Sequence, residues 1–541
     1  MRKVLMWVAL ACAGMVNAAD GVPTNAGETC TFVEGVRYSQ LVINARINDF
    51  KANTKVAGFG TYDSQGNQLA APQSSSSTLD YVPGLVAKAI IEAVDYYKDS
   101  ETIDVAPWYY AVQSYANRCD ITSNGKSGKS FDDLNAVKLY FVLSQLAASG
   151  RFADSPSYSN ATTIQKAGQR FADALRGIAQ ANSNYVIKAS TLQGAAGGWW
   201  HKSSYTNQMW CDGQYMGPAL LAQLINAYND YTPISDDDWS LLIKQFTISW
   251  HYLWDDEAQL LYHAFTADPG GSAASKWAGV SATTGAEVYH SAEYWGRAAA
   301  WYFLALVDVL EQLELAGMKD TEHYQTLRGY LQLLAAGIAA RQDDATGCWY
   351  QLLAHDGTFV ADSYDQSYRY TSSPVANYLE ASCSAIFIAA YLKGMRLGLY
   401  DTDYTNLATK AYRGFVEHFM VSDGNGGVHL VYSCRSAGLG GSNYRDGSAA
   451  YYLLGKDTQP TGLAASDFYT EGKVLGGFIL AATEYERLSD QTATDITPDV
   501  HYYNKGENRN DKVYDLQGRP MTDSPKSKGP YLLNGKKLLN P

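Results

Sequence analysis

The sequence predicts an all-α protein, built as a closed ring of helical hairpins, with a small β appendage at its C-terminal end. About eleven segments, each roughly 12–25 residues long, carry apolar residues at helical spacing, and no sustained run of alternating strands interrupts them. Loops rich in Gly, Ser and Asp join these segments, which is typical of helices packed side by side. With 541 residues, 46% of them hydrophobic, the chain can bury a large core.

Each helix is predicted from apolar residues that recur every three or four positions. In the first helix, Leu85, Ala89 and Ala93 follow this spacing. Pro83 lies in its first turn, where the missing N–H costs no hydrogen bond. In chain order, the predicted helices are Tyr81–Lys98, Pro107–Arg118, Asp132–Ala148, Thr163–Ala179, Gln214–Tyr228, Asp237–Leu253, Ala292–Ala316, Glu322–Ala340, Asn377–Leu397, Asn406–Met420 and Glu471–Leu488.

Four long loops separate some of these helices. Because loops in such a ring gather at its two ends, we expect a functional site to be built from them. They are Ile187–Asn207, Ala267–His290, Gln342–Pro374 and Val421–Phe468.

The first 19 residues have the pattern of an export signal. Arg2 and Lys3 precede the apolar run Val4–Val16, and the small residues of Asn17–Ala19 offer a cleavage site. We therefore expect an exported protein, located in the periplasm or at the cell surface of a Gram-negative bacterium. Cys12 could carry a lipid anchor, as an alternative to cleavage at Asn17–Ala19. No segment reaches about 18 uninterrupted apolar residues, so no transmembrane helix is expected.

The remaining chain divides into three parts. Residues 20–75 form an N-terminal extension, 76–495 the helical domain, and 496–541 a linker and tail. Within the tail, Val513–Pro520 and Gly529–Leu539 are predicted to form short strands, with a turn at Asn534–Gly535.

Charge and cysteine content exclude several classes of function. A net charge of −13 argues against nucleic acid as a partner, which would require a basic surface. None of the seven cysteines forms a close-spaced pair, and no ligand cluster has metal spacing, so we expect no metal and no cofactor. Cys30 and Cys119 could pair in an oxidising compartment, but the sequence does not show it, and the oligomeric state stays open.

The segment Gly197–Met216 is the strongest indication of function. It sets one carboxylate, Asp212, among indoles and an imidazole, including Trp210 and His201. Indole faces pack on the apolar face of a sugar ring, and by excluding water they raise the pKa of a carboxyl group. The segment thus favours a sugar-binding site that moves a proton, although a Trp-rich loop can also simply cover a core.

Five motifs occur in order along the chain: Gln208–Met216, Leu261–Phe265, Glu293–Trp301, Asn377–Ser382 and Gly438–Ser448. Together they resemble glycoside hydrolase family 105, the unsaturated rhamnogalacturonyl hydrolases. The resemblance extends from about Tyr81 to Leu488, and the family's fold is an (α/α)6 barrel. The tail resembles C-terminal appendages on exported proteins of the Bacteroidetes.

The resemblance implies an unusual reaction. Its substrate is an oligosaccharide that carries a terminal 4,5-unsaturated uronic acid, left by a polysaccharide lyase. An Asp protonates C4, and water adds at C5 after losing a proton to the same carboxylate; the hemiketal then opens and releases the next sugar. One acid of raised pKa is needed, rather than the spaced carboxylate pair of ordinary glycosidases.

The family's motifs assign two acids. Asp212 matches the catalytic acid/base, and capping the following helix is its alternative role. Asp132 matches the second functional acid, with Asp133 as the alternative, and would hold substrate hydroxyls or tune the charge on Asp212. Both acids could also simply open a helix. Ala136–Val137 departs from the family's usual Pro-Gly, which puts the local turn in doubt.

Six further residues are expected to bind substrate. Arg297 and Trp301 are four residues apart and therefore lie on one helix face. Arg297 would offer its guanidinium to the uronate carboxylate, and Trp301 its indole to the sugar ring. The structural alternative for Arg297 is a salt bridge to Glu293. His201 and His263 match family positions that line the pocket. Tyr81 matches a family tyrosine near the bound sugar, with core packing as the alternative, and Trp210 would supply an apolar wall beside Asp212.

Three functions follow from these residues. The first is removal of the unsaturated galacturonyl residue from rhamnogalacturonan-lyase products. The second is a related hydrolase acting on glucuronyl oligosaccharides, for which the loops Ala267–His290 and Gln342–Pro374 would decide. The third is a non-catalytic carbohydrate-binding barrel, which would not need a lone desolvated acid.

Overall fold

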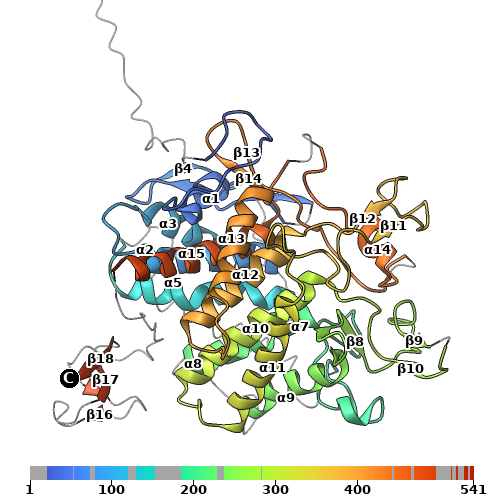
Figure 1. Cartoon of the computed structure of the whole chain (residues 1–541). Coiled ribbons are helices and arrows are strands. Elements are labelled where there is room, and N and C mark those ends of the chain that lie inside the picture. Colours follow the sequence, from blue (N-terminus) through green and yellow to red (C-terminus); the bar gives the residue numbers. More distant parts are fainter. Residues whose placement is uncertain are drawn as a thin grey trace, which may run out of the picture.

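The computed structural model describes residues 21–494, apart from 53, 74–79, 120–129, 153–183, 228–236, 282, 442–443 and 465–467, together with four short strands between residues 513 and 540. Within these residues the architecture is a ring of helices inside a second layer of helices (Figure 1).

Six helices of the described chain form the inner ring. Each contacts the next, and the last contacts the first, so the ring is closed. Figure 1 shows the last of them, in red, beside the first. The inner helices are α2 (Tyr81–Tyr97), α5 (Lys138–Ala148), α8 (Pro218–Ala227), α10 (Gly296–Leu315), α12 (Ala381–Arg396) and α15 (Gly472–Thr494).

Outer helices alternate with the inner ones along the chain. Each packs on one inner helix: α3 on α2, α9 on α8, α11 on α10, α13 on α12 and α1 on α15. Their bounds are α1 (Tyr38–Arg46), α3 (Ala106–Arg118), α9 (Asp238–Leu253), α11 (Glu322–Ala339) and α13 (Thr405–Phe419). This is the arrangement of an (α/α)6 barrel, so the predicted all-α fold class is confirmed. The predicted helix Thr163–Ala179 lies outside the described residues.

The burial pattern explains which helices are inside. In α10 every residue from Gly296 to Leu310 is buried, because neighbouring helices cover it on all sides. By contrast, α13 buries one stripe that includes Ala408, Tyr412 and Phe415, and turns its charged residues to solvent. A helix that buries only one apolar stripe therefore lies in the outer layer, whereas a helix buried on all sides lies in the inner ring.

Two predicted helices are interrupted in the structure. Asp132–Ala148 divides into α4 (Phe131–Leu134), a 3₁₀ turn at Asn135–Val137, and α5. Gln214–Tyr228 divides into α7 (Cys211–Met216) and α8, because Gly217 departs from helical geometry and Pro218 begins a new helix. Both breaks lie where the chain turns from the site into the inner ring.

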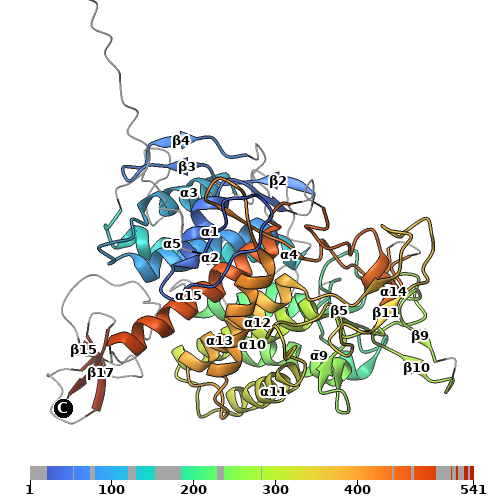
Figure 2. The same cartoon turned by 45° about the horizontal axis from the view of Figure 1, so that its top comes forward.

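Short antiparallel strand pairs join the helices at one end of the barrel. Figure 2 shows β9–β10 and β11–β12 standing out from the helices beside the short helix α14 (Ala449–Leu454). The pairs are β5 (Gln208–Trp210) with β8 (Ala264–Thr266), β6 (Trp254–Asp255) with β7 (Leu260–Leu261), β9 (Gly279–Val280) with β10 (Glu287–Val288), β11 (Val360–Ala361) with β12 (Val375–Ala376), and β13 (Met420–Ser422) with β14 (Val428–Leu430).

The N-terminal extension packs onto the barrel. Its strands β1 (Phe50–Ala52), β2 (Lys55–Ala57), β3 (Thr61–Tyr62) and β4 (Gln68–Ala70) form two hairpins. The ring of Tyr38 in α1 contacts that of Tyr412 in α13, and Phe50 belongs to the same hydrophobic core as the inner helices. The extension therefore covers part of the barrel wall.

The C-terminal tail contains the predicted strands, and the structure adds two strand pairings that the sequence did not indicate. The four strands form one sheet in the order β16-β15-β17-β18. They are β15 (Val513–Tyr514), β16 (Pro520–Met521), β17 (Gly529–Leu533) and β18 (Lys536–Asn540).

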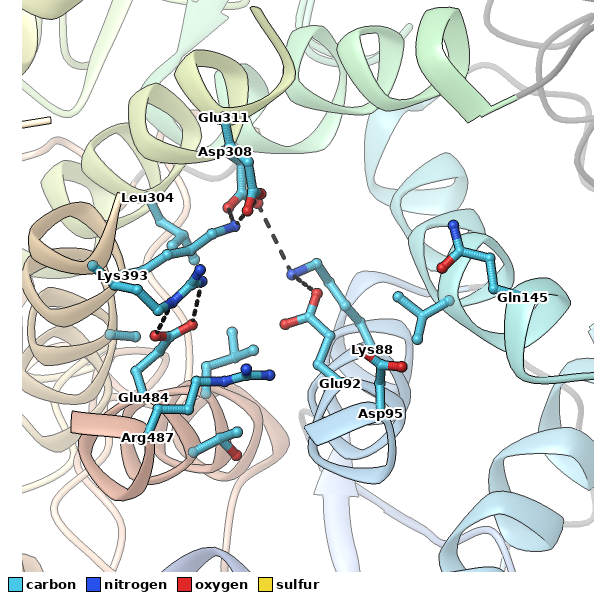
Figure 3. Close-up of a pocket in the computed structure, with 15 residues that line it drawn as sticks. Lys88, Glu92, Asp95, Gln145, Leu304, Asp308, Glu311, Lys393, Glu484 and Arg487 are labelled. Carbon is cyan, nitrogen blue, oxygen red and sulfur yellow. Dashed lines mark hydrogen bonds and ion pairs between the residues drawn. The ribbon is translucent and has the colours of Figure 1, made fainter. Parts of the chain in front are cut away.

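A network of ion pairs fills the end of the barrel formed by the later turns of the inner helices (Figure 3). Lys393 Nζ lies 2.7 Å from both Asp308 Oδ1 and Glu311 Oε2. Arg396 makes two hydrogen bonds to Glu484, of 2.7 and 2.8 Å. These pairs join α10, α12 and α15 around a cavity of about 110 Å³. Because opposite charges face one another across it, the network compensates the charges that the barrel buries.

The described cysteines are all buried and free. Cys30 and Cys119, which could have paired, are both thiols. None of the described helices is long and apolar enough to cross a membrane. In the same residues, no group of three or more His, Cys, Asp or Glu side chains is placed to hold a metal ion.

Candidate functional site

The candidate site lies where the inner helices begin. Asp132 and Asp212 stand in the first turns of α4 and α7, and Tyr81 and Arg297 begin α2 and α10. Four segments far apart in the sequence thus bring the predicted residues to one end of the barrel.

A strand pair places Asp212 beside His263. Strand β5 pairs with β8 so that Trp210 lies opposite Ala264. The Cys211 N–H then donates to the His263 carbonyl at 3.1 Å. As a result His263 Nε2 lies 3.6 Å from Asp212 Oδ2. That carboxylate oxygen is buried and has no hydrogen-bond partner in the described part of the chain.

Asp212 does not cap α7. The helix begins at Cys211, its N-cap position is Trp210, and no side chain caps it. The alternative role of Asp212 as a helix cap is therefore wrong. The buried oxygen without a partner is instead the arrangement expected of a group that transfers a proton to a ligand.

A second backbone contact fixes the other acid. The Phe131 N–H donates to the His201 carbonyl at 3.1 Å, and Ser130 bridges to Lys202. This pairing brings Asp132 between His201 and Lys202. Its Oδ1 lies 2.6 Å from His201 Nε2, and its Oδ2 accepts a hydrogen bond of 2.7 Å from Lys202 Nζ.

The environment of Asp132 determines its charge. Burial raises the pKa of Asp132, but His201 and Lys202 outweigh burial and hold it well below its usual range. Asp132 is therefore ionised at any ordinary pH. Asp132 is the better candidate for the second acid, because it is the carboxylate that both His201 and Lys202 contact. Asp132 and Asp133 both lie in the first turn of α4, so they also stand where acidic side chains favour the start of a helix.

Aromatic rings enclose the two acids. Trp210 stacks on Tyr205 with ring centroids 4.3 Å apart, and its Nε1 donates to Gln208 Oε1 at 3.0 Å. The edges of His201 and His263 meet the same indole, at 5.8 and 4.9 Å between centroids. Trp210 is therefore in contact with both imidazoles.

Arg297 and Trp301 lie deeper than expected. Arg297 Nη1 donates to the Cys434 carbonyl at 2.5 Å and to Ser382 Oγ at 3.1 Å, and lies 3.9 Å from Glu380. The alternative salt bridge of Arg297 to Glu293 is wrong, since Glu293 faces His355. Burial lowers the pKa of Arg297, but nearby acidic groups outweigh it, so the guanidinium stays charged. Its contact with a uronate stays a prediction.

Trp301 is fully buried below Tyr81. The two rings meet edge to face at 6.4 Å, and Tyr215 packs on the other side of the indole at 4.9 Å. Its Nε1 has no partner in the described chain. Tyr81 is partly exposed and lies above it, so of these two rings Tyr81 is the one placed to touch a ligand.

Three residues of the site were not predicted: Lys202, Tyr205 and Tyr452. Lys202, next to His201, pairs with Asp132 and lies over the ring of Tyr205. Its place beside a candidate histidine in the Trp-rich segment was a usable signal. Tyr452, from α14, hydrogen-bonds to His263 Nδ1 at 2.7 Å. It is far from the other site segments in sequence, and no pattern pointed to it.

Comparison with known proteins identifies the family. The family model described as Glycosyl Hydrolase Family 88 matches residues 61–489. The chain belongs to glycosyl hydrolase family 88. It is therefore a glycoside hydrolase, and it acts on an oligosaccharide.

Individual relatives agree with this assignment. This glycoside hydrolase is 33% identical to the 24.9 kDa protein in picA locus of Rhizobium radiobacter over 235 residues, which cover 41% of the chain and 84% of that protein. It is 26% identical to a solved family 105 glycoside hydrolase from C. acetobutylicum, with a TM-score of 0.55, covering 76% of this chain and 94% of the other. The resemblance to glycoside hydrolase family 105 is confirmed.

A second solved structure supports the fold alone. A possible family 105 member from Salmonella enterica is 17% identical with a TM-score of 0.54, and the match covers 84% of this chain and 96% of the other.

Proposed function

We propose that this glycoside hydrolase removes the terminal 4,5-unsaturated galacturonyl residue from rhamnogalacturonan-lyase products by hydrating the C4=C5 double bond. The observation that carries the proposal is the contrast between the two acids. Asp212 has a buried oxygen without a hydrogen-bond partner in the described residues, whereas Asp132 is held ionised by His201 and Lys202. Asp212 is thus available to transfer a proton, and Asp132 is not.

This contrast disfavours ordinary glycoside hydrolysis. That reaction needs one carboxylic acid to protonate the leaving oxygen and a second carboxylate to attack or to activate water. Asp132 already accepts two charge-assisted contacts, which lower its basicity. Hydration of a double bond requires only one proton-transferring carboxyl, and Asp212 meets that requirement.

The proposed steps use the residues as they stand. Asp212 gives its proton to C4, which breaks the double bond and leaves positive charge at C5. A water molecule adds at C5 and returns a proton to the Asp212 carboxylate. The resulting hemiketal opens and releases the next sugar, so the acid ends the cycle in its starting state.

The other site residues would bind the sugar. Lys202 is about a quarter exposed and supplies positive charge next to Asp132. Asp132 would accept hydrogen bonds from sugar hydroxyls, and Tyr205, backed by Trp210, offers a ring against which a sugar can pack. The export pattern at the N-terminus supports action in the periplasm or at the cell surface.

The experiment follows the loss of the conjugated enol-uronate, which absorbs in the ultraviolet. Purified protein is mixed with an unsaturated galacturonyl-rhamnose disaccharide, beside Asp212→Asn and the matched variant Asp133→Asn. We expect absorbance to decay with wild type and Asp133→Asn but not with Asp212→Asn. Decay with Asp212→Asn would remove Asp212 as the acid.

Glucuronyl substrates are the alternative in the same class. If the galacturonyl disaccharide is stable, unsaturated glucuronyl disaccharides are tested next. Decay there would assign the glucuronyl activity, and its absence would favour a barrel that binds carbohydrate without catalysis.

A further inference from the structure

His263 is held rigidly between two indoles. It lies between β7 and β8 and is fully buried. Its ring meets that of Trp210 at 4.9 Å and that of Trp295 at 4.7 Å between centroids. The Trp295 Nε1 in turn donates to Gln351 Oε1 at 3.0 Å, which anchors the second indole. The imidazole therefore has one orientation.

Each imidazole nitrogen faces a different group. Nδ1 lies 2.7 Å from the Tyr452 hydroxyl, and Nε2 lies 3.6 Å from Asp212 Oδ2. Tyr452 is fully buried in α14, and Gln351 Nε2 donates to its carbonyl at 3.3 Å. The hydroxyl has no other hydrogen-bond partner within the described residues.

The imidazole is neutral at ordinary pH. Burial lowers the pKa of His263, and Arg297 and His201 lower it further, against the opposing effect of Asp212. These three groups and Tyr452 are the charged and titratable groups that face it, from α10, the loop before β5, α7 and α14. A neutral imidazole carries one proton, on either Nδ1 or Nε2.

Only one tautomer leaves every buried proton of this group facing an acceptor. If Nδ1 carried the proton, it would donate to the Tyr452 oxygen, and the tyrosine's own proton would lack an acceptor in a fully buried place. If Nε2 carries the proton, the tyrosine donates to Nδ1 and Nε2–H points at Asp212. An oxygen of Asp212 can accept that hydrogen whether the acid is protonated or ionised.

We propose that Tyr452 is a positioning residue that fixes the tautomer of His263, so that Nε2–H faces Asp212 and the carboxyl proton is left for the substrate. The inference rests on the proposed function, in which Asp212 gives up that proton. With the opposite tautomer, a bare Nε2 would accept the Asp212 proton and hold it away from the sugar. Nε2–H also stabilises the carboxylate that forms once the proton has moved.

The kinetic test compares Tyr452→Phe with the matched variant Tyr451→Phe, which removes a buried hydroxyl from the next position of the same helix. We expect Tyr452→Phe to lower kcat by about tenfold or more. We also expect the high-pH limb of its kcat profile to move to higher pH, because the Asp212 proton is held more tightly. Tyr451→Phe should keep the wild-type profile. An unchanged limb in Tyr452→Phe would overturn the proposal, since a merely structural defect lowers kcat without moving it.

A second measurement needs no activity. The protein is labelled with 15N-histidine, and the signals of His263 are assigned by their loss in His263→Gln. We expect wild type to show a protonated Nε2 and an unprotonated Nδ1, and Tyr452→Phe to show a mixture of tautomers. A protonated Nδ1 in wild type would overturn the proposal. If wild type hydrates no unsaturated disaccharide, the proposed function fails, and the tautomer is still decided.

Discussion

His201 Nε2 lies 2.6 Å from Asp132 Oδ1, although the two residues are 69 positions apart in the chain. The contact forms because the backbone of Phe131 hydrogen-bonds to His201, which sets the two segments in register. It separates the roles of the two acids. It helps to keep Asp132 charged, whereas Asp212 Oδ2 has no hydrogen-bond partner among the described residues.

Asp132→Asn should impair both activity and acid-sensitive stability. Its pKa is depressed in the folded state, so its contribution to stability is present above the unfolded value, about 3.9, and is lost as the pH falls through the lower folded value. We expect kcat/KM to fall by about 100-fold. The Tm difference from wild type should be largest above about pH 5 and shrink below about pH 4. An equal Tm difference at pH 3 and pH 7 would contradict the role of His201 and Lys202.

Glu486→Gln should change how stability depends on pH. Burial raises the pKa of Glu486 to about 7, despite hydrogen bonds from Ser39 and Tyr97. The folded state holds a proton that the unfolded chain releases near pH 4.3, so stability falls as the pH rises from there to about 7. We expect the variant to lack this decline in Tm, measured from pH 4.5 to 8.

Glu484, two residues away on the same helix, is the matched control. Burial raises its pKa, but Arg396 outweighs burial and lowers it to about 2. Glu484→Gln should therefore be destabilised throughout the range from pH 4.5 to 8. Parallel curves for Glu484→Gln and Glu486→Gln would show that the two environments do not differ as described.

Lys393→Met should destabilise the barrel. The change leaves Asp308 and Glu311 without their shared cation in a buried place, at a cost of about 3–5 kcal/mol. Urea unfolding measures this loss. Adding Asp308→Leu should recover part of it, because the uncompensated charge is removed. Because the ion-pair network lies far from the candidate site, kcat of Lys393→Met should match wild type at temperatures well below unfolding. A lower kcat there would contradict this separation.

Gly337→Ala should be destabilising because another chain segment touches the helix there. A Cβ on Gly337 would lie 1.8 Å from the carbonyl oxygen of Gln259. We expect a loss of about 1–3 kcal/mol or more. Gly329, in the same helix α11, has open space around it, so Gly329→Ala should gain about 0.5–1 kcal/mol. Thermal unfolding of the two variants gives the comparison; a stabilised Gly337→Ala would show that the carbonyl can move away.

Helical periodicity was sufficient to predict the barrel. The ends of α2 and α9 were predicted to within one residue of those observed. The helix α1 was missed, because its stripe is short and interrupted by polar residues such as Asn44. The breaks at Asn135–Val137 and Gly217 were also missed, since apolar spacing continues across them.

The candidate site was predicted where motifs are local and missed where contacts are distant. Asp212 and Trp210 stand in one segment, so their association was visible. The hydrogen bond between Tyr452 and His263 joins residues 189 apart, and the ion-pair partner of Arg297 is Glu380 rather than the nearby Glu293. Such pairings depend on the order of helices around the ring, which the spacing of apolar residues does not specify.

The separation of the two ends of the barrel has an evolutionary consequence. Arg297 and Asp308 stand on the same helix, eleven residues and therefore about 17 Å apart along its axis. The ion-pair network stands near the later turns, whereas the loops that surround the acids precede the first turns. Insertions or substitutions in those loops can alter which sugar is accepted without disturbing the charges that hold the ring together. The architecture thus allows selection for new substrates to proceed with little penalty in folding.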